Sequence, residues 1–351
     1  MHTDQLKTQS NLFDRIDIWR GVLAYIVCVC HCFQLISPIE WRNDRLMSIL
    51  GDCAHFSVLA FFFLSGYVIF FSLKQKSKNN LQIKFKAFLT SRVSRIYPPL
   101  IASIFLCYLF KFVYSYLSIS NNKIYCFNFS YQEVLTYLFM IKPSLGQVNA
   151  PLWSLILEWW FYFVGFVVFK IITTKKKTFL FFALILMCLL VFQCYRVNTG
   201  FASYLLTWLL GALFSYFNTT KKSLKALLFF GMVSLFMAIL FREYFFKKPV
   251  SDVWQLKLLF VFAFIGVLNF IPISPFFKRA SSYSYSLYIY HYPTFLFVTG
   301  IEYYYDLNRY SILIFFCVLF FVIIGSIFLS RIFEKKEALL IFFKKNNFQR
   351  S

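Results

Sequence analysis

Residues 55–73 read HFSVLAFFFLSGYVIFFSL, a run without a single Lys, Arg, Asp or Glu. A helix needs about 20 apolar residues to cross the roughly 30 Å hydrocarbon core of a bilayer. The whole chain has the same character, because 60% of its 351 residues are hydrophobic and only 14% are charged. Soluble domains hold about 45–50% apolar and about 25% charged residues. The sequence therefore predicts a polytopic membrane protein and excludes a soluble globule, a disordered chain and a small disulfide scaffold.

Similar apolar segments recur along the chain and predict about ten membrane-spanning helices. The expected fold class is an all-α helix bundle that forms one domain over residues 1–351. The predicted spans lie near residues 18–37, 55–73, 98–118, 152–172, 178–195, 201–218, 226–241, 253–272, 284–300 and 311–331. The fifth, sixth and seventh of these are short, so a merged or re-entrant segment is an alternative there.

The basic residues predict the orientation. The chain holds 36 Lys and Arg against 14 Asp and Glu, a formal net charge of +22. They form short clusters between apolar segments, which is typical of loops between spans and not of a nucleic-acid-binding patch. Most of them fall on one side of the membrane if both termini are cytoplasmic. Residues 1–13 are polar and lack the apolar core of a signal peptide, so the first span is expected to stay in the protein.

Two ionisable residues stand out in the first span, Arg20 and His31. Ionisable groups inside a span cost free energy and are by default functional candidates. Eleven residues separate them, so they share one helix face about 16 Å apart along the axis. The alternatives are that Arg20 only anchors the span at its cytoplasmic end and that His31 only hydrogen-bonds another helix. The cysteines of residues 28–32 lack the spacing of a zinc or haem site, and no metal site is predicted.

The fourth span carries Glu158 about 10 Å from its outer end, and His31 is predicted at the same depth. A carboxylate and an imidazole at one level can act as a base and its orienting partner and so activate a hydroxyl. The alternative is a structural pair of Glu158 with a His or an Arg.

Arg92 and Arg95 end the cytoplasmic loop before the third predicted span. At a spacing of three residues they share one face of a short helix and form a fork suited to phosphate oxygens. Pro98 then suits the start of the next helix. The alternative is topological, because a basic loop beside a span needs no ligand.

Two other motifs predict local packing. The Ser65–Gly66 step predicts a close contact between helices. In the ninth span, His291 is predicted about 10 Å from the inner face and therefore below His31, as a supporting rather than a catalytic residue. Pro293 predicts a kink.

In this order the motifs resemble those of the acyltransferase-3 family of integral membrane acyltransferases, which O-acetylate bacterial O-antigens, exopolysaccharides, Nod factors and some macrolides. The segments that resemble the family's motifs are residues 17–21 with His31, 61–67, 92–98, 151–162 and 285–293. Ile18 replaces a family glycine, and Leu59 lies where an acidic residue is often found. The SGNH-type domain fused to some members is not found in this sequence.

The resemblance implies an acyl-CoA donor, most simply acetyl-CoA, that arrives from the cytoplasm, with no permanently bound cofactor. It implies as acceptor a hydroxyl of a lipid-linked glycan at the outer side of a bacterial inner membrane. On this reading His31 is the general base and Glu158 orients it, or His31 carries the acyl group transiently. Arg20, Arg92 and Arg95 would bind acyl-CoA. The residues expected to shape the acceptor side or support the site are Asp17, Ser65, Trp153, Ser154, Tyr288 and His291.

Two other functions are weighed against this one. A transporter or flippase of a lipid-linked glycan would use the same intramembrane charges as a relay or substrate site, but the paired repeats common in transporters are not found. A membrane glycosyltransferase is weaker, since the chain has no acidic D-x-D loop. The oligomeric state and a pairing of Cys53 with Cys126 stay open.

Overall fold

The structure is a computed structural model that describes residues 2–78, 84–117, 130–141, 148–174, 178, 201–215, 231, 233, 234, 237, 254–268 and 274–334. In these ranges all the regular elements are helices, so the predicted all-α fold class is confirmed. Their bounds are α1 His2–Ile36, η1 Ile39–Trp41, α2 Asp44–Lys78, α3 Phe85–Tyr116, α4 Tyr131–Leu138, α5 Leu152–Thr174, α7 Phe201–Phe214, α9 Trp254–Val267, α10 Pro275–Ala280, α11 Ser284–Tyr304, η4 Asn308–Tyr310 and α12 Ser311–Phe333.

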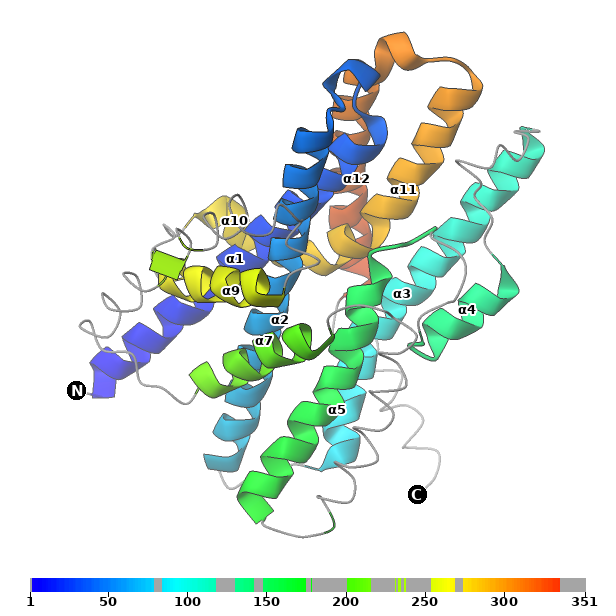
Figure 1. Cartoon of the computed structure of the whole chain (residues 1–351). Helices are drawn as coiled ribbons and strands as arrows, with labels where there is room; N and C mark the ends of the chain where they lie inside the picture. Colours follow the sequence, from blue (N-terminus) through cyan, green and yellow to red (C-terminus); the bar gives the residue numbers. More distant parts are fainter. Residues whose placement is uncertain are drawn as a thin grey trace, which may run out of the picture.

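Helix α2 forms the centre of the bundle and contacts α1, α5, α7 and α9. Most of its middle is apolar, and Leu59, Phe62 and Phe63 are all buried there, as expected of a helix surrounded by other helices. Figure 1 shows α2 running through the middle of the molecule with α7 and α9 lying across it. Helix α1, which contacts α2, also packs against α11 and α12.

Five helical segments are long and apolar enough to cross a membrane: Leu12–Ile36, Asp44–Ser77, Phe85–Tyr116, Leu152–Thr174 and Asn308–Phe333. Helix α12 leaves a row of phenylalanines exposed, among them Phe316, Phe320 and Phe328. Large exposed apolar side chains in such a row suit contact with lipid. The chain is thus a polytopic helical membrane protein.

The third span differs from its prediction, because α3 begins at Phe85 and continues through Pro98 and Pro99 as one helix. Proline is tolerated inside membrane helices when neighbouring side chains satisfy the disturbed backbone. The carbonyls that Pro98 and Pro99 leave without a helical donor are those of Ser94 and Arg95, and two tyrosines of α11 bond carbonyls close to them. Tyr285 donates to the carbonyl of Ile96 (3.1 Å), and Tyr290 donates to the carbonyl of Pro99 (3.2 Å).

Helices α7 and α9 lie within the predicted spans 201–218 and 253–272 but have only 14 residues each. At 1.5 Å per residue they are about 21 Å long, shorter than the hydrocarbon core. The predicted spans 178–195 and 226–241 lie almost wholly outside the described residues. The predicted total of ten spans and the cytoplasmic placement of both termini therefore stay predictions.

The predicted contact at Gly66 is present and is reciprocal. A Cβ on Gly66 would meet the backbone carbonyl of Trp208 in α7, and a Cβ on Gly211 would meet the backbone carbonyl of Phe63 in α2. Two glycines therefore bring the backbones of α2 and α7 into direct contact, as small residues do between membrane helices. This contact fixes the part of α2 that carries Ser65.

We expect Gly211→Ala to destabilise the fold strongly, because a backbone carbonyl cannot rotate away as a side chain can. Overpacking of this kind costs about 1–3 kcal/mol or more. The midpoint of thermal unfolding in detergent should fall clearly. Gly325→Ala is the matched control, because a Cβ at Gly325 meets nothing within 4 Å. An unchanged midpoint for Gly211→Ala would contradict the close contact.

Candidate active site

Two neighbouring cavities lie inside the bundle, and both are lined by Val58 and Tyr288. The first, here the arginine cavity, has a volume of about 100 Å³, and the second, the histidine cavity, about 270 Å³. The polar residues of the arginine cavity are Arg20, Ser65, Arg92, Arg95, Ser154, Glu158, Tyr162, Ser284, Tyr285 and Tyr288. Those of the histidine cavity are His31, Gln34, His55, Trp153, Tyr288 and Tyr292.

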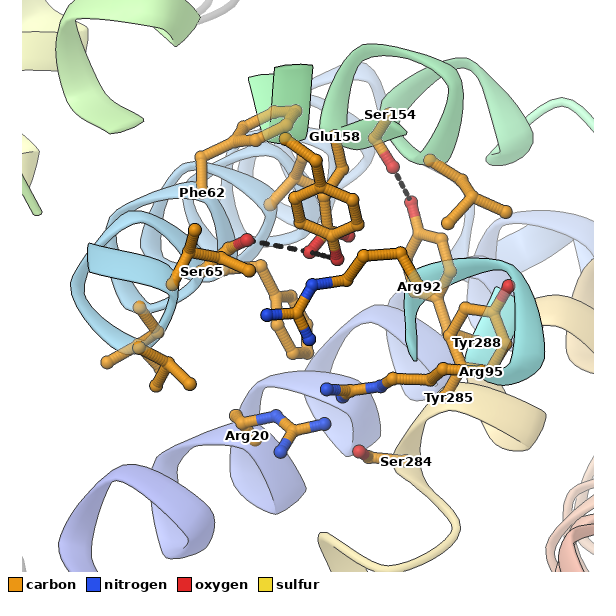
Figure 2. Close-up of a pocket in the computed structure, with 17 residues that line it drawn as sticks. Arg20, Phe62, Ser65, Arg92, Arg95, Ser154, Glu158, Ser284, Tyr285 and Tyr288 are labelled. Atoms are coloured by element: carbon orange, nitrogen blue, oxygen red, sulfur yellow. Dashed lines mark hydrogen bonds between the residues drawn. The ribbon is translucent and has the colours of Figure 1, made fainter. Parts of the chain in front are cut away.

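Three arginines from two helices meet in the arginine cavity, Arg20 from α1 and Arg92 and Arg95 from α3. Figure 2 shows the three side chains extending into the same space. Arg20 has an ion pair with Asp17 at 3.5 Å, one helical turn away. The sequence placed these arginines in separate motifs, and the fold brings them together.

Arg92 is held by aromatic rings. Its guanidinium lies 5.2 Å from the ring centroid of Phe88 and 5.4 Å from that of Tyr162, both within cation–π range. Its buried Nε has no hydrogen-bond partner among the described residues. Buried polar atoms are nearly always hydrogen-bonded, so an orphaned donor in a cavity points to a ligand.

Glu158 is the carboxylate of the arginine cavity, and two hydroxyls hold it. Ser65 donates to its Oε1 at 2.7 Å and Tyr162 at 2.6 Å. In the described part of the chain no arginine is within ion-pair distance of Glu158. Three guanidinium groups thus face one carboxylate, and the cavity suits an anion with several oxygens.

The N-terminus of α11 forms one wall of the arginine cavity, and Glu334 caps it from beyond the end of α12. Its Oε1 accepts the backbone N–H of Ser286 at 2.9 Å as well as the Ser286 hydroxyl. A carboxylate at this position satisfies a free backbone N–H, and the positive end of the helix dipole stabilises its negative charge. Burial raises the pKa of the Glu334 carboxyl above its ordinary value, and the two hydrogen bonds from Ser286 oppose that rise.

His31 lies in the second cavity with its ring oriented by Gln34. Its Nδ1 is 3.1 Å from Oε1 of Gln34, one helical turn away. With the Gln34 amide in this orientation its oxygen accepts from Nδ1, and the neutral ring then has its lone pair on Nε2. Trp153 and Tyr292 line the same cavity. A neutral imidazole with an oriented acceptor nitrogen has the form of a general base.

The structure corrects the predicted pairing of His31 with Glu158. The two residues line different cavities, and the oxygens of Ser65 and Tyr162 occupy the position beside Glu158 that the prediction gave to the imidazole. His31 lines the same cavity as Pro151 and Trp153, which lie at the start of α5. Glu158 is about 8 Å further along that helix.

The prediction that His291 lies below His31 is also wrong. The two imidazole rings are stacked, with centroids 5.4 Å apart and planes inclined by 17°. His291 is fully buried, and its Nδ1 donates to the carbonyl of Leu287 at 2.9 Å. It therefore supports one face of the His31 ring, and its Nε2 has no hydrogen-bond partner among the described residues.

Sequence reasoning missed His55, which lines the histidine cavity. Its Nε2 lies 3.0 Å from the hydroxyl of Tyr204 in α7. Lys257 of α9, itself buried, donates to the same hydroxyl at 3.4 Å. A signal was available, since the chain has only four histidines and His55 stands at the start of a predicted span. Gln34 could have been found from its spacing, since a residue three positions after His31 lies one helical turn away on the same face.

The remaining predicted residues fall as follows. Ser154 and Tyr288 meet through a hydrogen bond of 2.6 Å at the boundary between the cavities, and Figure 2 shows the pair. Trp153 lies beside His55 and faces the histidine cavity. Cys126, whose pairing with Cys53 the sequence leaves open, lies outside the described residues.

Residues 13–331 match the model of a protein family described as an acyltransferase domain. No curated protein and no solved structure matches the chain. The matched region contains every residue that lines the two cavities.

Proposed function

Because this chain belongs to the acyltransferase-3 family and is a membrane acyltransferase, we propose that it moves an acetyl group from cytoplasmic acetyl-CoA to a hydroxyl of a cell-surface glycan. The donor would bind in the arginine cavity and the acceptor in the histidine cavity. The protein would act in the inner membrane of a bacterium. No permanently bound cofactor is required, since the thioester supplies the acetyl group.

One observation carries this proposal: α1 is an unbroken helix that places Arg20 in one cavity and His31 in the next. The two residues are about 16 Å apart along the axis. The phosphates of CoA suit the three arginines, and its extended pantetheine arm can cover that distance to bring the thioester toward His31. The basic residues predict that the arginine end faces the cytoplasm, where acetyl-CoA is made.

The chemistry follows from the position of Nε2 of His31. This nitrogen takes the proton of the acceptor hydroxyl while the hydroxyl oxygen attacks the carbonyl carbon of the thioester. The C–S bond then breaks, and the thiolate of CoA takes the proton from the imidazolium. The products are an acetyl ester and free CoA. Gln34 and the ring of His291 hold the base in place, and Glu158 offsets the repulsion among the three arginines.

The proposal is tested by incubating membranes that contain the protein with [¹⁴C]acetyl-CoA and measuring label in the glycan fraction. We expect label to enter glycan and to be released by mild alkali, as an O-ester is. Mass spectra of glycan from cells with and without the protein should differ by acetyl groups.

Unlabelled glycan with unchanged mass would contradict an acetyl transfer to glycan. Label in glycan that resists mild alkali would contradict the O-ester. If the glycan is moved across the membrane but never labelled, a transporter or flippase is the better description.

A further inference from the structure

The boundary between the two cavities is formed by two hydroxyl groups that share one carbonyl. Tyr288 of α11 lies 2.6 Å from Ser154 of α5, hydroxyl to hydroxyl. The backbone carbonyl of Pro151 lies 3.0 Å from the Tyr288 hydroxyl and 3.2 Å from the Ser154 hydroxyl. Both side chains line the arginine cavity, and Tyr288 and Pro151 also line the histidine cavity.

The Pro151 carbonyl has two donors besides Tyr288. The backbone N–H of Ser154 and the Ser154 hydroxyl both donate to it, each at 3.2 Å. The single hydrogen of the Tyr288 hydroxyl can therefore turn toward a new acceptor without leaving the carbonyl unsatisfied. In that sense it is a spare donor, because turning it avoids the usual cost of a buried polar group left without a partner.

The position of this spare donor matches a need of the reaction. The thioester carbonyl must lie where the donor cavity meets the acceptor cavity, and its oxygen gains negative charge when the acceptor hydroxyl attacks. Acyl transfer is accelerated by hydrogen-bond donors placed 2.7–3.1 Å from that oxygen. The three arginines are assigned above to the phosphates of CoA, and Tyr288 is the hydroxyl that lines both cavities.

We propose that Tyr288 is a catalytic residue whose hydroxyl donates to the oxyanion of the tetrahedral intermediate, while Ser154 takes over its bond to the Pro151 carbonyl. This role deepens the proposed acetyl transfer and rests on it. The acceptor oxygen bonds to the carbonyl carbon, its proton passes to His31, and the former carbonyl oxygen carries the charge. When the C–S bond breaks, the carbonyl reforms, CoA leaves as the thiol, and the Tyr288 hydroxyl returns to Ser154 and Pro151.

The test uses three variants of the full-length protein in membranes: Tyr288→Phe, Ser154→Ala and the double variant. The rate is the initial incorporation of [¹⁴C]acetyl into glycan at saturating acetyl-CoA. Tyr288→Phe should lower kcat by about 10²–10³-fold, the usual effect of removing one oxyanion donor, with an unchanged KM for acetyl-CoA. Ser154→Ala should lower kcat less, because it removes only the hydroxyl that positions Tyr288 and leaves the backbone N–H on the Pro151 carbonyl.

The double variant distinguishes a shared system from two separate contributions. With the spare hydrogen already lost in Tyr288→Phe, the further loss of Ser154 should change kcat by less than threefold. Losses that multiply would contradict the sharing of one carbonyl. A kcat for Tyr288→Phe within threefold of the unmodified protein, or a loss seen only in KM, would overturn the proposal.

Tyr290→Phe is the matched control. It lies on the same helix, and its hydroxyl also donates to one backbone carbonyl, that of Pro99, but it lines neither cavity. Its unfolding midpoint should fall as much as that of Tyr288→Phe or more, while its kcat stays unchanged. If Tyr288→Phe does not fold, Ser154→Ala decides the outcome. An unchanged kcat in that variant would contradict the positioning of the Tyr288 hydroxyl by Ser154. If the unmodified protein labels no glycan, the proposed function fails before this inference does.

Discussion

His31→Ala is expected to reduce glycan acetylation by about 10²–10⁴-fold while the protein inserts and folds normally. General base catalysis contributes acceleration of this order, and Nε2 of His31 is the oriented acceptor nitrogen of the histidine cavity. The measurement is the initial rate of [¹⁴C]acetyl transfer at saturating acetyl-CoA. Cys30→Ala, on the same helix but lining neither cavity, should retain the rate.

A variant of Gln34 distinguishes a catalytic role of His31 as base from a purely structural role. Gln34→Ala removes the acceptor for Nδ1 of His31 and should slow transfer about tenfold, with little change in the unfolding midpoint. If His31→Ala keeps the full rate, the imidazole is not the base. If it loses the rate only because the protein unfolds, the role of His31 is structural.

The second large effect concerns the binding of acetyl-CoA. We expect Arg92→Met and Arg95→Met each to raise the KM for acetyl-CoA by about 10–100-fold and to leave kcat little changed. Hydrogen bonds to charged groups contribute about 1.5–3 kcal/mol, and an interaction made equally in the ground state and the transition state appears in KM. Arg92→Lys should recover only part of the affinity, since an ammonium lacks the planar fork.

Lys86→Met is the control for charge. Lys86 lies on the same helix, is exposed, and lies outside the cavities, so its loss changes the net charge equally without removing a cavity contact. An equal rise in KM for Lys86→Met would mean that long-range attraction, and not the arginine cavity, binds the donor.

The sequence predicts the fold best where a segment is apolar on all sides. The spans 152–172 and 311–331 agree with α5 and α12 to within two residues, because length and hydropathy alone define them. The start of α3 was misplaced because proline usually begins a helix or breaks it, and nothing local shows that Tyr285 and Tyr290 will stabilise the backbone around Pro98.

The sequence identified individual residues of the candidate site but not which of them lie together. Ionisable residues in apolar surroundings identified Arg20, His31 and Glu158, since only function or pairing repays their burial. Their partners depend on which helices are neighbours and how deeply each begins. The depths of His31 and Glu158 were each counted along its own helix, but His31 lines the cavity at Pro151 and Trp153, about 8 Å before Glu158 along α5. One-dimensional counting therefore paired Glu158 with an imidazole that lies in another cavity.

The rigidity of α1 has a consequence for donor selection. On the proposed function, one uninterrupted helix carries both the phosphate-binding Arg20 and the base His31, so the length of α1 between them would set where the thioester arrives. An acyl group larger than acetyl would then extend past that position toward the incoming alcohol. We therefore expect short acyl-CoA donors to be preferred over long ones.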